Sequence, residues 1–518
     1  MAAGVFAIGP RGQGAPAAIV ALILAGLIGG ALAAVAWQAR GLSALGPWDW
    51  RAVWFTLWQA ALSAGLSASL AVPVARALAR RRFVGRGALV TLLGAPFILP
   101  VIVAIMGLIA VFGRNGAING GLRAAGLPEI AIYGWQGVIL AHVFFNLPLS
   151  VRLILQGWQA IPAERFRLAA SLGFGPADVA RHLERPMLRA VLPGVCLAVF
   201  LVCLTSFTVA LALGGGPDAT TVELAIYQAF RFDVDLGRAA MLGLVQIALC
   251  LIALAAARAI VVPAAFGAGG DARAAAGAGP GGWRRGADAV TIALAALFLL
   301  WPIGAVIWRG LPRLTVLPPE IWDAAARSMA MAVASAFVSM AAALVLALQL
   351  ARRPGGWIEA AGMLPLVASP LVLGTGLFLI LRPVVAPQSL ALPLTVVVNA
   401  LMALPFGLRA LIPAARTLEQ DYGRLAAALD LRGWARLRLL VLPRLARPLG
   451  FAGGLAAALA MGDLGVITLF ATDRPTLPLL LYQLMGAYRM ADASAAAVLL
   501  MAISLGLFWI FDRGGRLA

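Results

Sequence analysis

The sequence predicts an all-α integral membrane protein with about twelve transmembrane helices. Its 518 residues are 62% apolar and only 12% charged, and the mean hydropathy is +0.96. Soluble domains usually carry about 25% charged residues, so much of this chain must face lipid. Uncharged apolar runs also recur at the length that a helix needs to cross the hydrocarbon core, roughly 20 residues.

Five of these runs have clear limits, and seven more are located by where they begin. The clear runs are Ala17–Trp37, Ala88–Phe112, Leu192–Ala212, Ala239–Ala257 and Val290–Trp308. The others start near Trp54, Trp135, Ser328, Ala360, Gln388, Leu449 and Ala493. The first run is longer than the apolar core of a secretory signal peptide, about 7–15 residues. We therefore expect it to be retained as a membrane anchor.

The basic residues, all of them arginine, predict the orientation of the chain. If the N-terminus is cytoplasmic, more than twice as many arginines fall inside as outside, whereas the acidic residues split evenly. A basic excess on one side without a matching acidic asymmetry follows the positive-inside rule. We therefore expect both termini in the cytoplasm. The net charge of +19 needs no nucleic-acid partner to explain it.

Residue types that commonly carry chemistry are scarce. Cys196, Cys203 and Cys250 lie inside apolar runs, where a thiol packs as a small apolar group, so we expect neither a disulfide nor a metal site. A Walker A loop needs a lysine to reach the nucleotide phosphates, and the chain contains no lysine. The sequence thus predicts a chain that performs no covalent chemistry and holds no cofactor.

The two halves of the chain are repeats of each other. HVFFNLPLSVR, which starts at His142, aligns with NALMALPFGLR, which starts at Asn399. Without a gap, RLAASLGFGPADVARHLERP from Arg167 aligns with RLAAALDLRGWARLRLLVLP from Arg424. Equivalent points are separated by an even number of spans, so both copies leave the membrane on the same side. The repeat is therefore parallel, unlike the inverted repeats of many secondary transporters.

This repeat predicts the domain organisation. We expect a first half at residues 1–261, with a core at about 54–257, and a second half at 289–518, with a core at about 325–511. Residues 262–288 contain GAGGDARAAAGAGPGGWRR, a composition that is typical of a flexible linker. The arginines of this linker suit a cytoplasmic hinge.

Each half carries one cytoplasmic loop with an arginine-bearing, alanine-rich segment. In the first copy Pro162 precedes a run of helix formers, and Gly173 begins a GFGP sequence that can end a helix and turn the chain. Small residues such as Ala169 and Ala170 allow another surface to approach closely. From the residues alone, two interpretations stay open: a docking element for a partner protein, and an amphipathic helix whose arginines lie at the lipid headgroups. Two related loops on one face favour a two-fold or pseudo-two-fold partner.

These loops resemble the EAA loop of ABC importer permeases, which forms a coupling helix seated in a cleft of the ATPase subunit. That motif has a small-residue pair, a glycine and, farther on, an apolar residue three positions before a proline. In the first loop the resemblance implies docking residues Arg167, Leu168, Ala169, Ala170, Gly173, Leu183 and Pro186. In the second loop it implies Arg424, Leu425, Ala426, Ala427, Asp430, Leu440 and Pro443.

The loops depart from the motif at two positions. Neither has the glutamate of the motif, whose place is taken by Arg167 and Arg424, and Asp430 stands where the glycine belongs. These departures leave open which residues make the key contacts and whether the two docking sites are equivalent.

Other stretches resemble the thiamine/thiamine-pyrophosphate ABC transporter permeases of Gram-negative bacteria. They are HVFFNLPL at 142–149, LGGGPDATTVELAIYQAF at 213–230, MGDLGVITLF at 461–470 and TLPLLLYQLMGAYR at 476–489. The resemblance implies two MetI-like halves in one inner-membrane chain, two copies of a separate ATP-binding ATPase subunit, and a periplasmic substrate-binding protein. Ferric-iron permeases with the same fused architecture are the alternative within the family.

An ion-coupled secondary transporter is the alternative from a different class, because such carriers can also have twelve spans in two parallel halves. ARRRFVGRGA at 79–88 faintly resembles a basic loop of those carriers. A carrier, however, has no need to repeat a long cytoplasmic loop between the fourth and fifth spans of each half. The loops therefore favour the ABC permease.

Three polar residues are candidates for a translocation pathway or gate. Asp463 is the one carboxylate inside a predicted span, where a charge costs on the order of 2.5–3.5 kcal/mol. It either faces the bundle interior or lies near the outer end of its helix, hydrogen-bonded to backbone. His142 begins a span opposite Asn399 of the other half, and packing or an inter-helix hydrogen bond explains it better than substrate contact.

Overall fold

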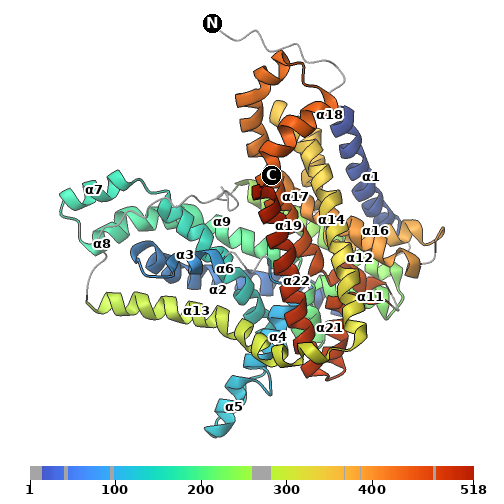
Figure 1. Ribbon diagram of the computed structural model, residues 1–518. Helices are drawn as coiled ribbons and strands as arrows, with labels where there is room; N and C mark the ends of the chain where they lie inside the picture. The colour runs from blue at the N-terminus through green and yellow to red at the C-terminus, as the bar shows by residue number, and fades with distance from the viewer. Residues whose placement is uncertain are drawn as a thin grey trace. The chain divides into compact units, whose positions relative to one another are not determined.

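The computed structural model describes residues 15–39, 45–93, 98–259, 282–366, 368–385, 387–470 and 474–517. In these ranges every regular element is a helix (Figure 1). Eleven helices are long and apolar enough to cross a membrane, and the bent pair Trp357–Leu366 and Pro370–Leu381 makes a twelfth if it is one span. The predicted all-α membrane class is therefore confirmed.

The elements fall in the chain order that the repeat predicts. The first half contains α1 (Ala15–Gln38), α2 (Pro47–Arg80), α3 (Arg86–Leu92), α4 (Val101–Phe112), α5 (Ala117–Ala124), α6 (Trp135–Gln159), α7 (Ala163–Ser171), α8 (Pro176–Val179), α9 (Arg185–Leu204), α10 (Thr208–Leu213), α11 (Val222–Arg231) and α12 (Leu236–Ala259). The second half contains α13 (Trp283–Gly310), α14 (Pro319–Arg352), α15 (Trp357–Met363), α16 (Pro370–Leu381), α17 (Pro387–Ala428), α18 (Gly433–Arg436), α19 (Leu442–Met461), α20 (Gly465–Leu469), α21 (Leu477–Gly486) and α22 (Met490–Leu517).

Two of the predicted apolar runs do not form single helices. In the run Ala88–Phe112, α3 ends at Leu92 and α4 begins only at Val101, directly after Pro100. Proline disfavours helical backbone in the residue before it and has no N–H of its own to donate, so a helix can start after Pro100 but not run through it. In the run Leu192–Ala212, α9 ends at Leu204 and the short α10 follows.

The described residues form two compact units that do not follow chain order. Unit 1 combines Met1–Trp37, Ala330–Ala460 and Gly506–Ala518, and unit 2 combines Gln38–Met329 and Met461–Leu505. Each unit therefore draws on both halves of the repeat. Much of the predicted linker lies outside the described residues, and α13 already begins at Trp283, so the predicted limits of the halves stay a prediction.

In unit 1, the first helix of the chain packs on a helix of the second half. A Cβ added at Gly376 of α16 would lie 2.3 Å from the carbonyl oxygen of Ala31 in α1, and Gly30 faces the side chain of Ile380. Small residues let transmembrane helices approach to backbone contact, which gains dispersion energy where the hydrophobic effect is absent. The small residues of α1 and α16 therefore form their interface.

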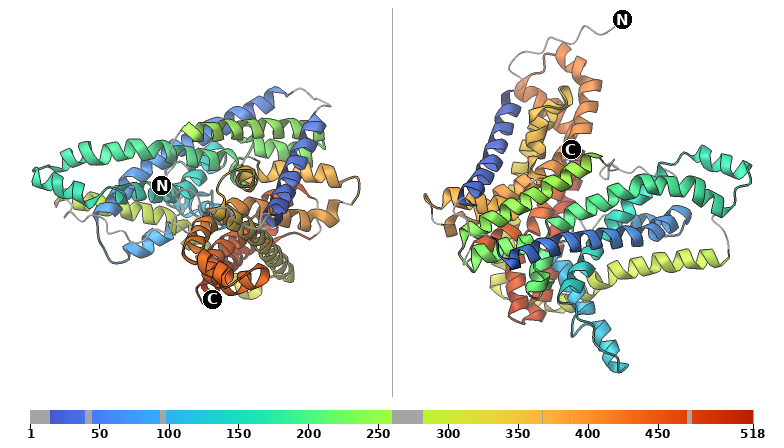
Figure 2. Two further views of the ribbon diagram at one scale, coloured as in Figure 1. Left: turned by 90° about the horizontal axis from the view of Figure 1, so that it is seen from above. Right: turned by 180° about the vertical axis from the view of Figure 1, so that it is seen from behind.

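In unit 2, the first helix of the second half packs on helices of the first half. A Cβ added at Gly107 of α4 would lie 2.6 Å from the carbonyl oxygen of Pro302 in α13. The rings of Phe144 in α6 and Phe298 in α13 meet edge to face with 5.7 Å between centroids, a favourable aromatic geometry. Figure 2 shows α13 running alongside α2.

Replacing Gly107 with alanine should loosen α13 from α4, because the added methyl group meets backbone that cannot turn away. Overpacking of this kind typically costs about 1–3 kcal/mol, so we expect a lower thermal unfolding midpoint for the purified chain in detergent. Gly304→Ala in α13 is the matched control, since no atom lies within 4 Å of its added Cβ. An equal or larger decrease for Gly304→Ala would contradict this packing.

Candidate functional site

The two loops that resemble the EAA motif fold into the same sequence of elements. Loop segment 1, residues 163–186, contains α7, α8 and the π-helical turn η3 (Ala180–Glu184), and leads into α9. Loop segment 2, residues 420–443, contains the end of α17, α18 and the π-helical turn η7 (Leu437–Val441), and leads into α19. Figure 1 shows α7 and α8 beyond the N-terminal end of α9.

The helix in loop segment 1 ends in a left-handed cap at Gly173, whose φ is +72°. The N–H of Phe174 donates to the carbonyl of Ala169 at 2.9 Å, and the N–H of Gly173 donates to that of Ala170 at 3.1 Å. This pair of hydrogen bonds is the Schellman motif, which satisfies the last carbonyls of a helix. Glycine is favoured at its left-handed position because it has no Cβ.

Loop segment 2 forms the same cap with a different residue. Asp430 has a φ of +49°, the N–H of Leu431 donates to the carbonyl of Ala426 at 2.9 Å, and the N–H of Asp430 donates to that of Ala427 at 3.2 Å. Aspartate visits this conformation more readily than most residues with a side chain. The departure from glycine therefore changes a side chain, which pairs with Arg432, and leaves the turn unchanged.

The terminal prolines of the motif explain the π-helical turns. Pro186 and Pro443 lie exposed in the first turn of α9 and α19. A proline ring clashes with the carbonyl four residues earlier and cannot donate to it, so a wider turn relieves the strain. In that turn the N–H of Arg185 donates to the carbonyl of Ala180, five residues back, and Leu442 repeats the pattern.

The two loop segments expose matching leucines. Leu168 and Leu172 are 60% and 62% exposed in loop segment 1, and Leu425 and Leu429 are 53% and 62% exposed in loop segment 2. Each pair is four residues apart, so the two side chains share one helix face. An apolar stripe that is rimmed by charged residues is typical of an interaction surface.

The remaining predicted docking residues also occupy matching environments. Ala169 and Ala426 are buried, whereas Ala170 and Ala427 are exposed. Leu183 and Leu440 are half-buried within the π-helical turns, and Arg167 and Arg424 are exposed.

Arg167 already has a partner within its own helix. Its guanidinium lies 2.7 Å from the carboxylate of Glu164. A backbone hydrogen bond at the start of α7 and this contact with Arg167 hold the pKa of the Glu164 carboxyl below its ordinary value. The position that carries glutamate in the EAA motif is thus part of an exposed ion pair, with the opposite charge at that place.

A buried glutamate fastens loop segment 1 to the long helix α2. Glu184 is 5% exposed and accepts hydrogen bonds or ion pairs from Arg76 at 2.8 Å and Arg80 at 2.7 Å. Removing one partner of a buried ion pair leaves an uncompensated charge, which is strongly destabilising. The end of α2 and the start of α9 are therefore held together.

Loop segment 2 is fastened to α14 by a glutamate from a different place. Glu419, in α17, accepts from Arg352 at 3.1 Å and from Arg436 of α18 at 2.6 Å. Arg352 ends α14 as Arg80 ends α2, and both helices have 34 residues. The sequence reasoning missed these anchors, and the signal that could have found them is the arginine at the end of each of these two helices.

The structure places His142 in a buried polar cluster. Its Nε2 lies 2.8 Å from the hydroxyl of Ser206, and its Nδ1 lies 3.5 Å from the hydroxyl of Ser63. Asn146, one turn farther along α6, donates to the sulfur of Cys203 at 3.4 Å. Because these contacts join α6 to α2 and to the end of α9, the geometry favours the inter-helix role of His142 over substrate contact.

The other two pathway candidates lie in different units. Asp463, in unit 2, is partly buried in the break between α19 and α20, and one carboxylate oxygen accepts from the N–H of Gly465 at 3.1 Å. This backbone hydrogen bond fits a residue at a helix end. Asn399 lies in α17 of unit 1 and is buried. Among the residues described, no group of three or more His, Cys, Asp or Glu could hold a metal ion.

Comparison with known proteins decides the family. The chain is 40% identical over 505 residues to the thiamine transport system permease protein ThiP of Brucella abortus, which covers 95% of this chain and 93% of that protein. The chain belongs to the family of thiamine transport system permeases. ThiP of Escherichia coli is 38% identical over 463 residues, 85% of this chain and 84% of its own length. ThiP of Haemophilus influenzae is 34% identical over 454 residues, 84% and 82%.

A family model agrees with this assignment. Residues 69–262 match the model described as binding-protein-dependent transport system inner membrane component. The resemblance that the sequence motifs indicated is confirmed, and this member of the thiamine permease family is a multi-pass inner-membrane transport permease.

Valine at the left-handed position should disrupt either loop segment. A β-branched side chain at positive φ is strongly disfavoured, by more than the about 1–2 kcal/mol that an ordinary residue costs. We expect Gly173→Val and Asp430→Val to speed tryptic cleavage within the altered segment, whereas Asp430→Gly should leave cleavage unchanged. Ala170→Val, exposed and helical, is the control. Equal cleavage rates for all four variants would show that the caps do not order these segments.

Proposed function

We propose that this chain forms the whole transmembrane pathway of an ABC importer that carries thiamine or thiamine pyrophosphate. The observation that carries the proposal is the pair of loop segments, which share a left-handed cap, a π-helical turn and an exposed leucine stripe. The names of relatives that span most of the chain support the substrate. The same relatives do not favour the ferric-iron permease or the ion-coupled carrier.

Each loop segment would bind one copy of a separate ATPase subunit. The stripes formed by Leu168 with Leu172 and by Leu425 with Leu429 are exposed, and burying a leucine contributes about 1.5–3 kcal/mol. The surrounding arginines can pair with acidic residues of the partner. ATP would be bound and hydrolysed by that subunit, so this chain would hold no cofactor and perform no covalent chemistry.

The anchors explain how movement of the ATPase would reach the membrane. Glu184 ties loop segment 1 to α2, and Glu419 ties loop segment 2 to α14. When ATP draws two ATPase copies together, each docked segment would pull on a helix of 34 residues. The pathway would then alternate between inward-open and outward-open states, each of which exposes the substrate to a different side.

The arginine distribution supports an orientation with both termini and both loop segments in the cytoplasm. A periplasmic substrate-binding protein would then deliver substrate on the opposite face. The matching family model, which describes a binding-protein-dependent system, supports such a partner.

Replacing the exposed leucines with glutamate should remove the ATPase one copy at a time. Losing two buried leucines weakens binding at a site by well over about tenfold. We expect Leu168→Glu with Leu172→Glu, or Leu425→Glu with Leu429→Glu, to lower the ATPase that co-purifies with the chain, and the four changes together to abolish it.

Leu127→Glu provides the control for that experiment. Leu127 is 54% exposed and precedes α6, at the end of that helix away from loop segment 1, so its replacement should leave the bound ATPase unchanged. Full ATPase recovery with the fourfold variant would rule out the two loop segments as docking sites.

A further inference from the structure

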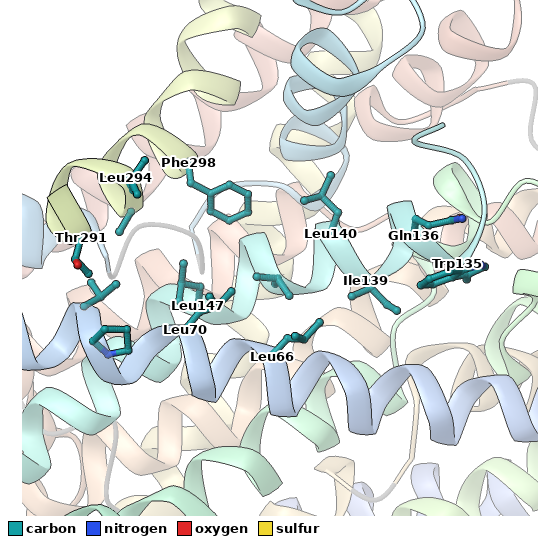
Figure 3. Close-up of a pocket in the computed structure, with 14 residues that line it drawn as sticks. Leu66, Leu70, Trp135, Gln136, Ile139, Leu140, Leu147, Thr291, Leu294 and Phe298 are labelled. Carbon is teal, nitrogen blue, oxygen red and sulfur yellow. The ribbon is translucent and has the colours of Figure 1, made fainter. Parts of the chain in front are cut away.

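Unit 2 contains an apolar groove between α2, α6 and α13 (Figure 3). Its volume is about 550 Å³, within the range of about 300–1,000 Å³ that is usual for ligand pockets. It is lined by Leu66, Leu70, Pro73, Val74, Trp135, Gln136, Ile139, Leu140, Val143, Leu147, Thr291, Leu294, Ala295 and Phe298. The lining is apolar except for the polar groups of Thr291, Gln136 and the indole, so a charged, water-soluble substrate such as thiamine does not fit it.

The groove lies on helices that are apolar and long enough to cross the membrane. All three of α2, α6 and α13 belong to candidate spans. Leu70 and Leu294, which line the groove, are 49% and 61% exposed. A groove wall that is both apolar and exposed on spanning helices faces hydrocarbon, so the molecules that surround it in the membrane are lipids.

The length of the groove suits one acyl chain. Along α6 it runs from Trp135 to Leu147, which is about 18 Å at the rise of an α-helix. One leaflet contributes about half of a hydrocarbon core of about 30 Å. Trp135 and Gln136 lie at one end of the groove and Thr291 at the other (Figure 3).

Positive charge gathers beyond the Thr291 end. Arg81, at the end of α2, pairs with Asp288 of α13 at 2.6 Å, one turn before Thr291. Arg284 lies two turns before Thr291 and therefore on the same helix face. Arg284 and its neighbour Arg285 are exposed, and within the described ranges neither has a carboxylate within 4.0 Å. Arginines directly beside the end of a spanning helix attract anionic lipid headgroups.

We propose that this groove binds one anionic phospholipid. One acyl chain lies between α2, α6 and α13, and the phosphate lies at Arg284 and Arg285. The lipid fills the space beside α13, which otherwise meets α6 through Phe298 and α2 through the ion pair of Asp288. This site is independent of the transported substrate and of the ATPase.

Native mass spectrometry of the full chain tests the site, with phosphatidylglycerol and phosphatidylethanolamine of identical acyl chains as probes. We expect the chain to retain one phosphatidylglycerol molecule in preference to phosphatidylethanolamine. Leu294→Trp, which fills the groove, should remove that molecule. Leu297→Trp, three residues away on α13, exposed and outside the lining, should retain it.

A charge variant tests the headgroup contact separately. Arg284→Gln with Arg285→Gln should weaken retention of phosphatidylglycerol by about tenfold or more, since each basic residue near anionic lipid changes affinity by about fivefold. Arg309→Gln, at the other end of α13, should not. Retention that is unchanged by both Leu294→Trp and the double arginine variant would overturn the site, and equal retention of the two lipids would overturn the anionic headgroup contact.

Discussion

Backbone N–H and C=O groups in hydrocarbon have no water to bond with, so the chain must satisfy them itself. This constraint explains why every regular element in the described residues is a helix. It also explains how the helices begin where the apolar runs break. Pro100 and Pro370 stand where an N–H would be left without a partner, and the hydroxyl of Ser369 accepts from the N–H of Val372 at 3.1 Å.

The same constraint shapes the two loop segments. Each must end one helix and start the next within a few residues, and both do so with a Schellman cap followed by a π-helical turn. Gly173 and Asp430 hold the same backbone conformation although their side chains differ. The cap leaves the preceding leucines exposed and directs the next helix back toward the membrane. A backbone requirement thereby produces the surface to which we assign docking.

Much of this architecture could be predicted from the sequence because it depends on local pattern. Apolar length gave the spans, and the aligned stretches from Arg167 and Arg424 gave the paired loops. The effect of Asp430 could not be predicted, since the alignment shows a lost glycine but not the left-handed turn that aspartate also accepts.

The tertiary contacts were beyond the reach of the pattern. Glu184 and Glu419 occupy unrelated positions in the repeat yet both bind the arginine that ends a long helix. The packing of Gly376 on α1 and of Gly107 on α13 was also hidden. The chain contains 57 glycines, and their sequence positions do not say which of them meet a partner helix.

The central claim is that ATP drives transport through this chain by way of its two loop segments. The most direct test reconstitutes the chain with its ATPase and binding protein in proteoliposomes and measures uptake of labelled thiamine. The account predicts uptake that requires ATP on the side of the loop segments and is lost when Leu168, Leu172, Leu425 and Leu429 are all glutamate. Uptake driven by an imposed ion gradient without the ATPase would contradict it.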